Sequence, residues 1–334
     1  MVDVVAFLGP LATYSHQATR LVFPEEEQKQ DDETGKDKAE KKKRWELLPT
    51  VTIREVFDKV QTGSARYGVV PFENSTHGTV TFTLDGLADR RGTYPDLEVC
   101  DEVYLDVHHY LLGRYPPGLG VSNTAGTHKD DRRKTPLVPL DHVKRVYSHP
   151  QAFGQTAGFV GRYLGGVETV DVSSTSKAAE LAAADATGTS AAIAGEMAGE
   201  KEGLDVLARE IEDREDNTTR FFVLRRTGDT GPGSGLRGGG GEGDKRYKSL
   251  VSFTVPHRTP GALADVLECF RRGGLNLTSI NSLPSLVEPF RYLFFVEFEG
   301  SGYDDPEGRV RGVFDSLERT AETWRWLGSW VNRR

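Results

Sequence analysis

The chain has 334 residues, of which 37% are hydrophobic and 28% are charged, and its formal net charge is −8. This length exceeds the size of a single hydrophobic core, so two or more domains are expected. The acidic balance disfavours nucleic acid as the main partner, because phosphate contacts require an extended basic surface.

The two cysteines, Cys100 and Cys269, lie far apart and form neither a CxxC nor a Cys/His spacing. This disfavours a zinc site or a disulfide framework and favours a reducing compartment. The first residues include no basic segment followed by a cleavage site, and no stretch approaches the length of a membrane span. We therefore expect an untargeted cytoplasmic protein without a membrane partner.

Strand-like and helix-like patterns alternate up to about residue 226, which predicts an α/β architecture. The predicted strands are 4–8, 67–70, 103–112, 145–147, 167–172, 191–194 and 220–224. The predicted helices are 15–22, 53–62, 151–163 and 174–184.

Two stretches interrupt this pattern. Residues 25–44 contain eight acids, seven bases and one apolar residue, so we expect an exposed or disordered insertion. Residues 228–243 contain nine glycines and lack the lysine of a phosphate loop, so we expect a linker over 227–246. The linker would separate a domain of residues 1–226 from a domain of residues 247–334.

After the linker the order changes to strand, helix, strand, strand, helix, strand, which predicts a ferredoxin-like βαββαβ module. The expected elements are the strands 249–255, 276–283, 292–299 and 324–330 and the helices 261–272 and 306–320.

Several polar turns follow or precede these elements. In the stretch Tyr67–Val80 a strand pattern passes into a polar turn, which predicts that Glu73, Asn74 and Ser75 lie just beyond the end of a strand. Open α/β sheets bind ligands at that edge. An ordinary turn explains the same residues equally well. Ser148 is placed to cap a helix that begins at Pro150, which does not exclude contact with a ligand.

Helix starts of this kind favour anions, because their backbone N–H groups point outward. Ser174 and Thr175 precede an alanine-rich helix with Lys177 in its first turn, where a cation opposes the helix dipole unless an anion is near. Ser15 begins a third such turn. Arg220 stands at the start of an apolar strand and is suited either to a substrate carboxylate or to an intramolecular ion pair.

The eight histidines show neither metal-ligand spacing nor a nucleophile partner, and no GxGxxG follows a strand. We therefore expect no metal and no dinucleotide cofactor.

Six stretches together resemble the prephenate dehydratase family in composition, order and spacing. They are GPLATYS (9–15), GVVPFENSTHGTV (68–80), YSHPQAFGQ (147–155), STSKAA (174–179), AAIA (191–194) and NTTRFFVL (217–224). The resemblance implies a two-lobed catalytic domain, like that of type II periplasmic binding proteins, followed by an ACT domain with the ferredoxin-like βαββαβ order. It also implies a substrate cleft between the lobes.

The same resemblance implies the decarboxylating dehydration of prephenate to phenylpyruvate in phenylalanine biosynthesis, without a cofactor. The expected catalytic residues are Thr219 as the group nearest the departing hydroxyl, with Glu73, Asn74, Ser148 and Gln155 in its network. The expected substrate-binding residues are Ser15, Ser75, Ser174, Thr175, Lys177, Arg220 and Phe221.

The ACT resemblance implies a homodimer or homotetramer that binds phenylalanine as an effector. The expected regulatory residues are Gly261, Ala262, Leu263, Asn276, Leu277, Asn281 and Ser282. The family's Glu-Ser-Arg-Pro motif is replaced here by Asn281-Ser-Leu-Pro284, so effector contacts are expected to differ. The competing functions are an arogenate dehydratase and a non-catalytic amino-acid sensor of the same fold.

Overall fold

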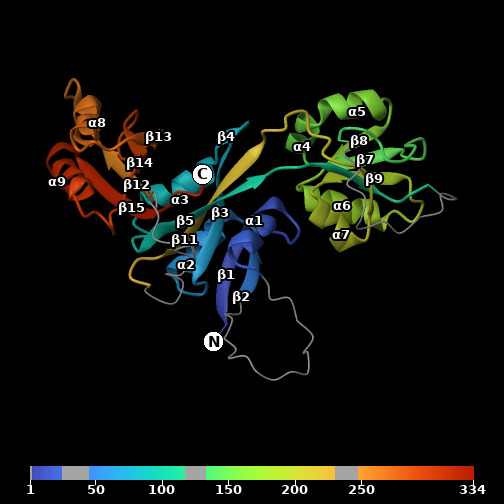
Figure 1. Cartoon of the computed structure of the whole chain (residues 1–334), viewed down its shortest axis with the longest axis horizontal. Helices are drawn as coiled ribbons and strands as arrows, with labels where there is room; N and C mark the ends of the chain where they lie inside the picture. The colour runs from blue at the N-terminus through green and yellow to red at the C-terminus, as the bar shows by residue number, and fades with distance from the viewer. Residues whose placement is uncertain (1, 25–44, 117–132, 230–246) are drawn as a thin grey trace. The chain divides into compact units, whose positions relative to one another are not determined.

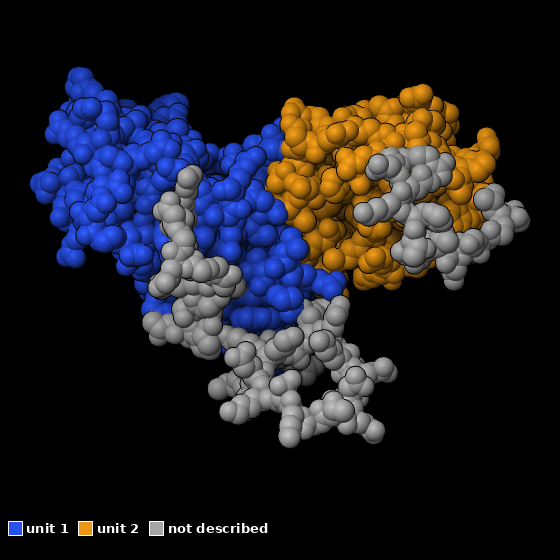
Figure 2. Space-filling model, viewed as in Figure 1, with its two compact units in different colours: residues 1–8, 18–104, 220–334 blue, residues 9–17, 105–219 orange. Residues whose placement is uncertain are grey.

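The computed structural model describes residues 2–24, 45–116, 133–229 and 247–334 (Figure 1). The charged insertion and most of the glycine-rich linker lie outside the described residues. The chain divides into two compact units: unit 1 comprises residues 1–8, 18–104 and 220–334, and unit 2 comprises residues 9–17 and 105–219 (Figure 2). The units cut across the domain boundaries predicted from the sequence, which remain predictions.

Unit 1 contains a sheet with the strand order β2-β1-β3-β11-β5, and β4 pairs with β3. β1 runs parallel to both β2 and β3. The elements up to the end of this part are β1 (Asp3–Leu8), α1 (Tyr14–Val22), β2 (Trp45–Thr50), α2 (Ile53–Gln61), β3 (Tyr67–Asn74), β4 (Gly78–Thr79), α3 (Thr81–Ala88) and β5 (Leu97–Asp106), with β11 (Thr218–Arg226) inserted later.

Helix α2 shows why these residues fold as they do. Its buried residues Ile53, Val56, Phe57 and Val60 recur at helical spacing and pack into the core beside the sheet. The hydroxyl oxygen of Thr52 caps the helix by accepting a hydrogen bond from the Glu55 N–H at 3.2 Å.

Unit 2 contains a second sheet with the order β10-β6-β9-β7-β8, in which β6 is antiparallel to β9 and β7 is parallel to both β8 and β9. Its elements are β6 (Tyr110–Gly113), β7 (Arg145–Ser148), α4 (Pro150–Gln155), α5 (Ala157–Tyr163), β8 (Glu168–Asp171), α6 (Thr175–Ala184), β9 (Ser190–Ala194), α7 (Glu196–Glu202) and β10 (Asp205–Ala208). Read from β8, the order β8-β7-β9-β6-β10 has the same pattern as that of the first sheet. In each sheet the fourth strand, β11 or β6, lies apart in the sequence from the three strands before it.

The residues after the linker form β12 (Tyr247–Thr254), α8 (Ala262–Arg272), β13 (Leu277–Pro284), β14 (Tyr292–Glu299), α9 (Arg309–Thr320) and β15 (Thr323–Val331). The strands pair antiparallel in the order β13-β14-β12-β15 (Figure 1). We call residues 247–331 the C-terminal module. Both the α/β class and the βαββαβ order are thus confirmed.

The sheet of the C-terminal module is covered on both faces. Residues such as Val251 and Val296 share a core with α8 and α9. Leu250, Leu327 and Trp330 instead join the core of the first sheet. The module is therefore an integral part of unit 1.

Two sequence-based predictions of elements are wrong. The single strand expected over 103–112 is two strands, β5 and β6, which belong to different sheets because the chain leaves unit 1 after Tyr104. The single helix expected over 151–163 is broken at Thr156, whose hydroxyl donates to the Ala152 carbonyl at 2.8 Å. Within the described ranges, no helix is long and apolar enough to cross a membrane.

Candidate active site

Glu73 and Asn74 lie within β3 rather than beyond it, because β3 continues into a hairpin in which Glu73 pairs with Thr79. The Asn74 side-chain oxygen accepts hydrogen bonds from the N–H groups of Thr76 and His77, both at 3.0 Å. Asn74 therefore shapes its own turn, whereas Ser75 at the turn is exposed.

Thr219 and Arg220 are neighbours on β11, at the point where the chain passes from unit 2 to unit 1. Thr219 is half-buried. Arg220 is only 6% exposed and Phe221 only 1%. The Arg220 guanidinium binds the carboxylates of Glu102 and Glu297. Of the two uses that the sequence left open, the structure shows the intramolecular ion pair, and the contact of Arg220 with a substrate carboxylate stays a prediction.

Ser148 does not cap helix α4, contrary to the sequence prediction. Its hydroxyl is fully buried and donates to the Ile193 carbonyl of β9 at 2.8 Å. The cap is instead His149, whose Nδ1 accepts from the Gln151 N–H at 3.2 Å. The hydroxyl of Ser148 thus ties β7 to β9 immediately before the helix that carries Gln155.

Gln155 belongs to a buried polar chain that sequence reasoning missed. Its Oε1 lies 2.6 Å from Nε2 of His109, and Nδ1 of His109 lies 2.8 Å from the Tyr14 hydroxyl. Glu212 accepts from the His109 N–H and from His108 Nδ1, both at 2.8 Å. These residues all belong to unit 2. The signal in the sequence was the His108-His109 pair.

Burial determines the protonation states of His109 and Tyr14. It lowers the pKa of His109, so the ring is neutral and one nitrogen donates while the other accepts. Burial, and then the charge of Glu212, raises the pKa of Tyr14 well above its usual value. Gln155 is therefore held by the neutral ring of His109 rather than by a charged group.

The start of α6 combines Ser174, Thr175 and Lys177, as predicted. The Ser174 hydroxyl oxygen caps the helix by accepting from the Lys177 N–H at 3.1 Å. The Lys177 ammonium lies 2.5 Å from a carboxylate oxygen of Glu180, and both side chains are exposed. Exposed pairs of this kind contribute little, so Lys177 can exchange this partner at small cost. Ser15 lies in the first turn of α1 and is buried.

One group within the described ranges has the ligands of a cation site. His108, Glu210 and Glu212 have ligand atoms within 4.8 Å of one another. Arg133 already binds Glu210 at 2.6 Å, and the two histidines already donate to Glu212. We assign no metal to this group, and the prediction of a metal-free enzyme stays a prediction.

The expected regulatory residues lie at the start of α8 and along β13. Gly261 precedes α8 with φ of 84°, a conformation that favours glycine, and Ala262 is buried. The Asn281 side-chain oxygen accepts a hydrogen bond from the Thr79 hydroxyl at 2.8 Å. Leu263, Asn276, Leu277 and Ser282 complete the set on the same two segments. Asn281, the first residue of the segment that replaces Glu-Ser-Arg-Pro, thus contacts the β3–β4 hairpin that contains Glu73 and Asn74.

A family model described as prephenate dehydratase matches residues 5–229. The bifunctional chorismate mutase/prephenate dehydratase of Aquifex aeolicus is 32% identical over 326 residues, which cover 98% of this chain and 73% of that protein. The range of the family model spans the six motifs and the residues on β3, α4, α6 and β11 described above.

Two solved structures resemble the whole chain. Prephenate dehydratase from Arthrobacter aurescens in complex with L-Phe has a TM-score of 0.72 and 27% identity, covering 98% of this chain and 90% of its own. GqqA, described as a novel type of quorum quenching acylase, has a TM-score of 0.72 and 25% identity, covering 98% of each chain. Both likenesses extend through the C-terminal module.

Proposed function

This chain belongs to the prephenate dehydratase family, and from that premise we propose that it converts prephenate to phenylpyruvate as a carbon–oxygen lyase of phenylalanine biosynthesis. The observation that carries the proposal is the family match over residues 5–229, which includes Thr219 on β11. The substrate is a small dianion.

The reaction breaks two bonds of the substrate ring. The electron pair of the bond to the ring carboxylate moves into the ring as CO2 leaves, and the C4 hydroxyl leaves with its bonding pair. Aromatisation drives both steps, so the protein has to orient the dianion and donate a proton or hydrogen bond to the departing hydroxide. We assign that donation to Thr219, with Glu73 as the titratable member of the predicted catalytic residues.

Asn74, Ser148 and Gln155 orient this site rather than donate to the leaving group. The Asn74 side-chain oxygen is used by its own turn, the Ser148 hydroxyl by β9, and the Gln155 amide by His109. Groups held in this way are preorganised, which lowers the cost of aligning the substrate.

The carboxylates of the substrate bind at the helix starts. Ser174 and Thr175 stand at the start of α6, which is ten residues long, and Lys177 contributes a cation in its first turn. Ser15 and Ser75 are the remaining proposed contacts, in the first turn of α1 and after β3. Phe221 is buried on β11, and its predicted contact with the substrate stays a prediction.

The test is incubation of the purified protein with prephenate, with and without EDTA, while phenylpyruvate absorbance is recorded in alkali. We expect product at the same rate in both samples. Binding of prephenate without product favours a sensor, and phenylalanine formed from arogenate favours an arogenate dehydratase. Acylase activity, with no action on prephenate, would instead match the activity named for GqqA.

We also propose that phenylalanine binds the C-terminal module and lowers activity, and that the chain is a cytoplasmic homodimer or homotetramer. The Arthrobacter aurescens enzyme with bound L-Phe supports the effector. Calorimetric titration of phenylalanine into the full chain tests it, and light scattering of the same sample gives the oligomeric state. No heat, together with unchanged activity at millimolar phenylalanine, would leave the module a structural role.

A further inference from the structure

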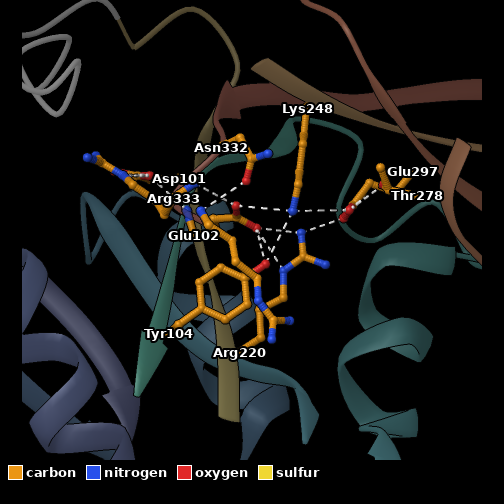
Figure 3. A network of polar contacts seen from close by, with 10 residues as sticks. Asp101, Glu102, Tyr104, Arg220, Lys248, Thr278, Glu297, Asn332 and Arg333 are labelled. Atoms are coloured by element: carbon orange, nitrogen blue, oxygen red, sulfur yellow. Dashed lines mark hydrogen bonds and ion pairs between the residues drawn. The ribbon is translucent and has the colours of Figure 1, made fainter. Parts of the chain in front are cut away.

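Four buried charges of unit 1 form one network between β5, β11 and the C-terminal module (Figure 3). The Arg220 Nε donates to Glu102 at 2.8 Å, and its Nη2 donates to Glu297 at 2.5 Å. The Lys248 ammonium lies 3.4 Å from Glu102 and 3.6 Å from Glu297. Glu102 and Arg220 come from the catalytic part, and Lys248 and Glu297 come from β12 and β14.

The network is electrically balanced and shielded from water. Each of the four residues is at most 6% exposed. Two carboxylates face two cations, so no charge is left without a counterpart. Although burial alone raises the pKa of Glu102, Arg220 and then other donors hold it below its usual value, so Glu102 is ionised. Loss of one member therefore leaves a buried charge uncompensated.

Aromatic rings restrict the guanidinium further. The Arg220 Cζ lies 4.9 Å from the ring centroid of Phe222 and 5.4 Å from that of Phe72. The Glu297 carboxylate is itself held by the Thr278 hydroxyl, which donates to it at 2.7 Å. Arg220 is thus fixed on several sides, and its peptide bond joins it directly to Thr219.

We propose that Glu297 and Lys248 of the C-terminal module are positioning residues for Thr219, which they hold through Arg220. This inference rests on the proposed role of Thr219 in the dehydration. The module then has a role besides binding an effector: its strands β12 and β14 hold β11, the strand that carries Thr219. A small displacement of a catalytic group lowers the rate strongly, so loosening Arg220 acts on the chemical step.

The same interface contains a matched control. Arg225 Nε donates to Glu98 at 2.6 Å, and the Tyr303 hydroxyl of the C-terminal module donates to the same carboxylate at 2.6 Å. This second contact joins the same strands β5 and β11, but Arg225 lies roughly 17 Å from Arg220 along the strand at the usual rise per residue. Tyr303→Phe therefore loosens the interface far from Thr219.

The experiment compares Glu297→Gln with Tyr303→Phe in the full chain, using prephenate turnover and the thermal midpoint. For Glu297→Gln we expect kcat to fall about tenfold or more while KM changes less than about threefold. Tyr303→Phe should keep kcat near that of the wild type. Equal kcat in Glu297→Gln and wild type would overturn the inference.

A double variant, Glu297→Gln with Lys248→Met, separates positioning from stability. It leaves one balanced buried pair, Glu102 with Arg220, so we expect it to regain thermal stability but not kcat. Recovery of wild-type kcat would show that the network only stabilises the fold, and would refute the proposal.

Hydrogen exchange of the segment 216–222 gives a readout that does not depend on turnover. We expect faster exchange in Glu297→Gln than in Tyr303→Phe, and equal exchange in both would also count against the inference. An inactive wild type would refute the proposed function, while this exchange comparison would still decide whether Glu297 holds the strand.

Discussion

Gly328 of β15 sits where the C-terminal module meets β5, and its replacement by alanine tests that contact. Its φ is +124°, and an added Cβ would lie 2.1 Å from the Val99 carbonyl oxygen. The Val99 oxygen is a backbone atom of β5 and the added Cβ is fixed to the backbone of β15, and each strand is paired within its own sheet, so neither can move aside as a flexible side chain would. The neighbours Leu327 and Trp330 belong to the shared core, so a shifted β15 also opens that core.

The cost has two parts. An L-residue held at this positive φ costs about 1–3 kcal/mol, and forcing extra volume into a packed site costs about 1–3 kcal/mol more. Gly328→Ala should therefore lower the free energy of unfolding of unit 1 by about 2–6 kcal/mol. Gly308→Ala is the control, because Gly308 also has a positive φ, of +68°, but an added Cβ there meets nothing within 4 Å.

Tryptophan fluorescence during a urea titration is the assay, since three of the chain's four tryptophans, at 324, 326 and 330, lie in β15. We expect Gly308→Ala to cost only the backbone part, about 1–2 kcal/mol. Equal losses for the two variants would refute the reasoning, because they would show that β15 does not approach β5 as closely as described.

Three further predictions concern the site. Thr219→Val should lower kcat by roughly two orders of magnitude with little change in KM, and a near-normal kcat would remove Thr219 from the chemistry. Ser148→Ala should cost about 1 kcal/mol of stability through its lost bond to Ile193, with a kcat loss below about tenfold; a much larger loss without destabilisation would indicate direct contact with the substrate. Burial lowers the pKa of His109 from its ordinary 6.5, so its contribution to stability is full above pH 6.5 and is lost as the pH falls towards the folded value. His109→Gln should therefore flatten the decline of stability below pH 6.5, by at most about 1.4 kcal/mol per pH unit, and an unchanged slope would contradict this.

Periodicity predicted the elements whose apolar residues repeat clearly. The helix expected over 53–62 is α2, Ile53–Gln61, and the strand expected over 292–299 is β14, Tyr292–Glu299. The strand β2, Trp45–Thr50, was missed because Pro49 argues against a strand; β2 is the edge of its sheet, where proline is tolerated. Helix α3 was missed because its sequence TFTLDGLA has almost no polar face.

The candidate site was less predictable than the fold, for a reason that Arg220 illustrates. An arginine at a strand start suits a substrate carboxylate and a protein carboxylate equally well. Its partners Glu102 and Glu297 lie far away in the sequence and are brought together only by the packing of β5, β11 and β14. The chain from Tyr14 through His109 to Gln155 is likewise assembled from three separate segments.

The insertion of β11 between β3 and β5 has a consequence for how the protein is made. During translation, β3 and β5 leave the ribosome well before β11, so their facing edges stay unpaired in the nascent chain. The five strands of the second sheet, by contrast, all lie between Tyr110 and Ala208 and emerge one after another. We expect that sheet to be completed first. Until Arg226 has emerged, the unpaired edges of β3 and β5 make the nascent chain prone to aggregation and a substrate for chaperones.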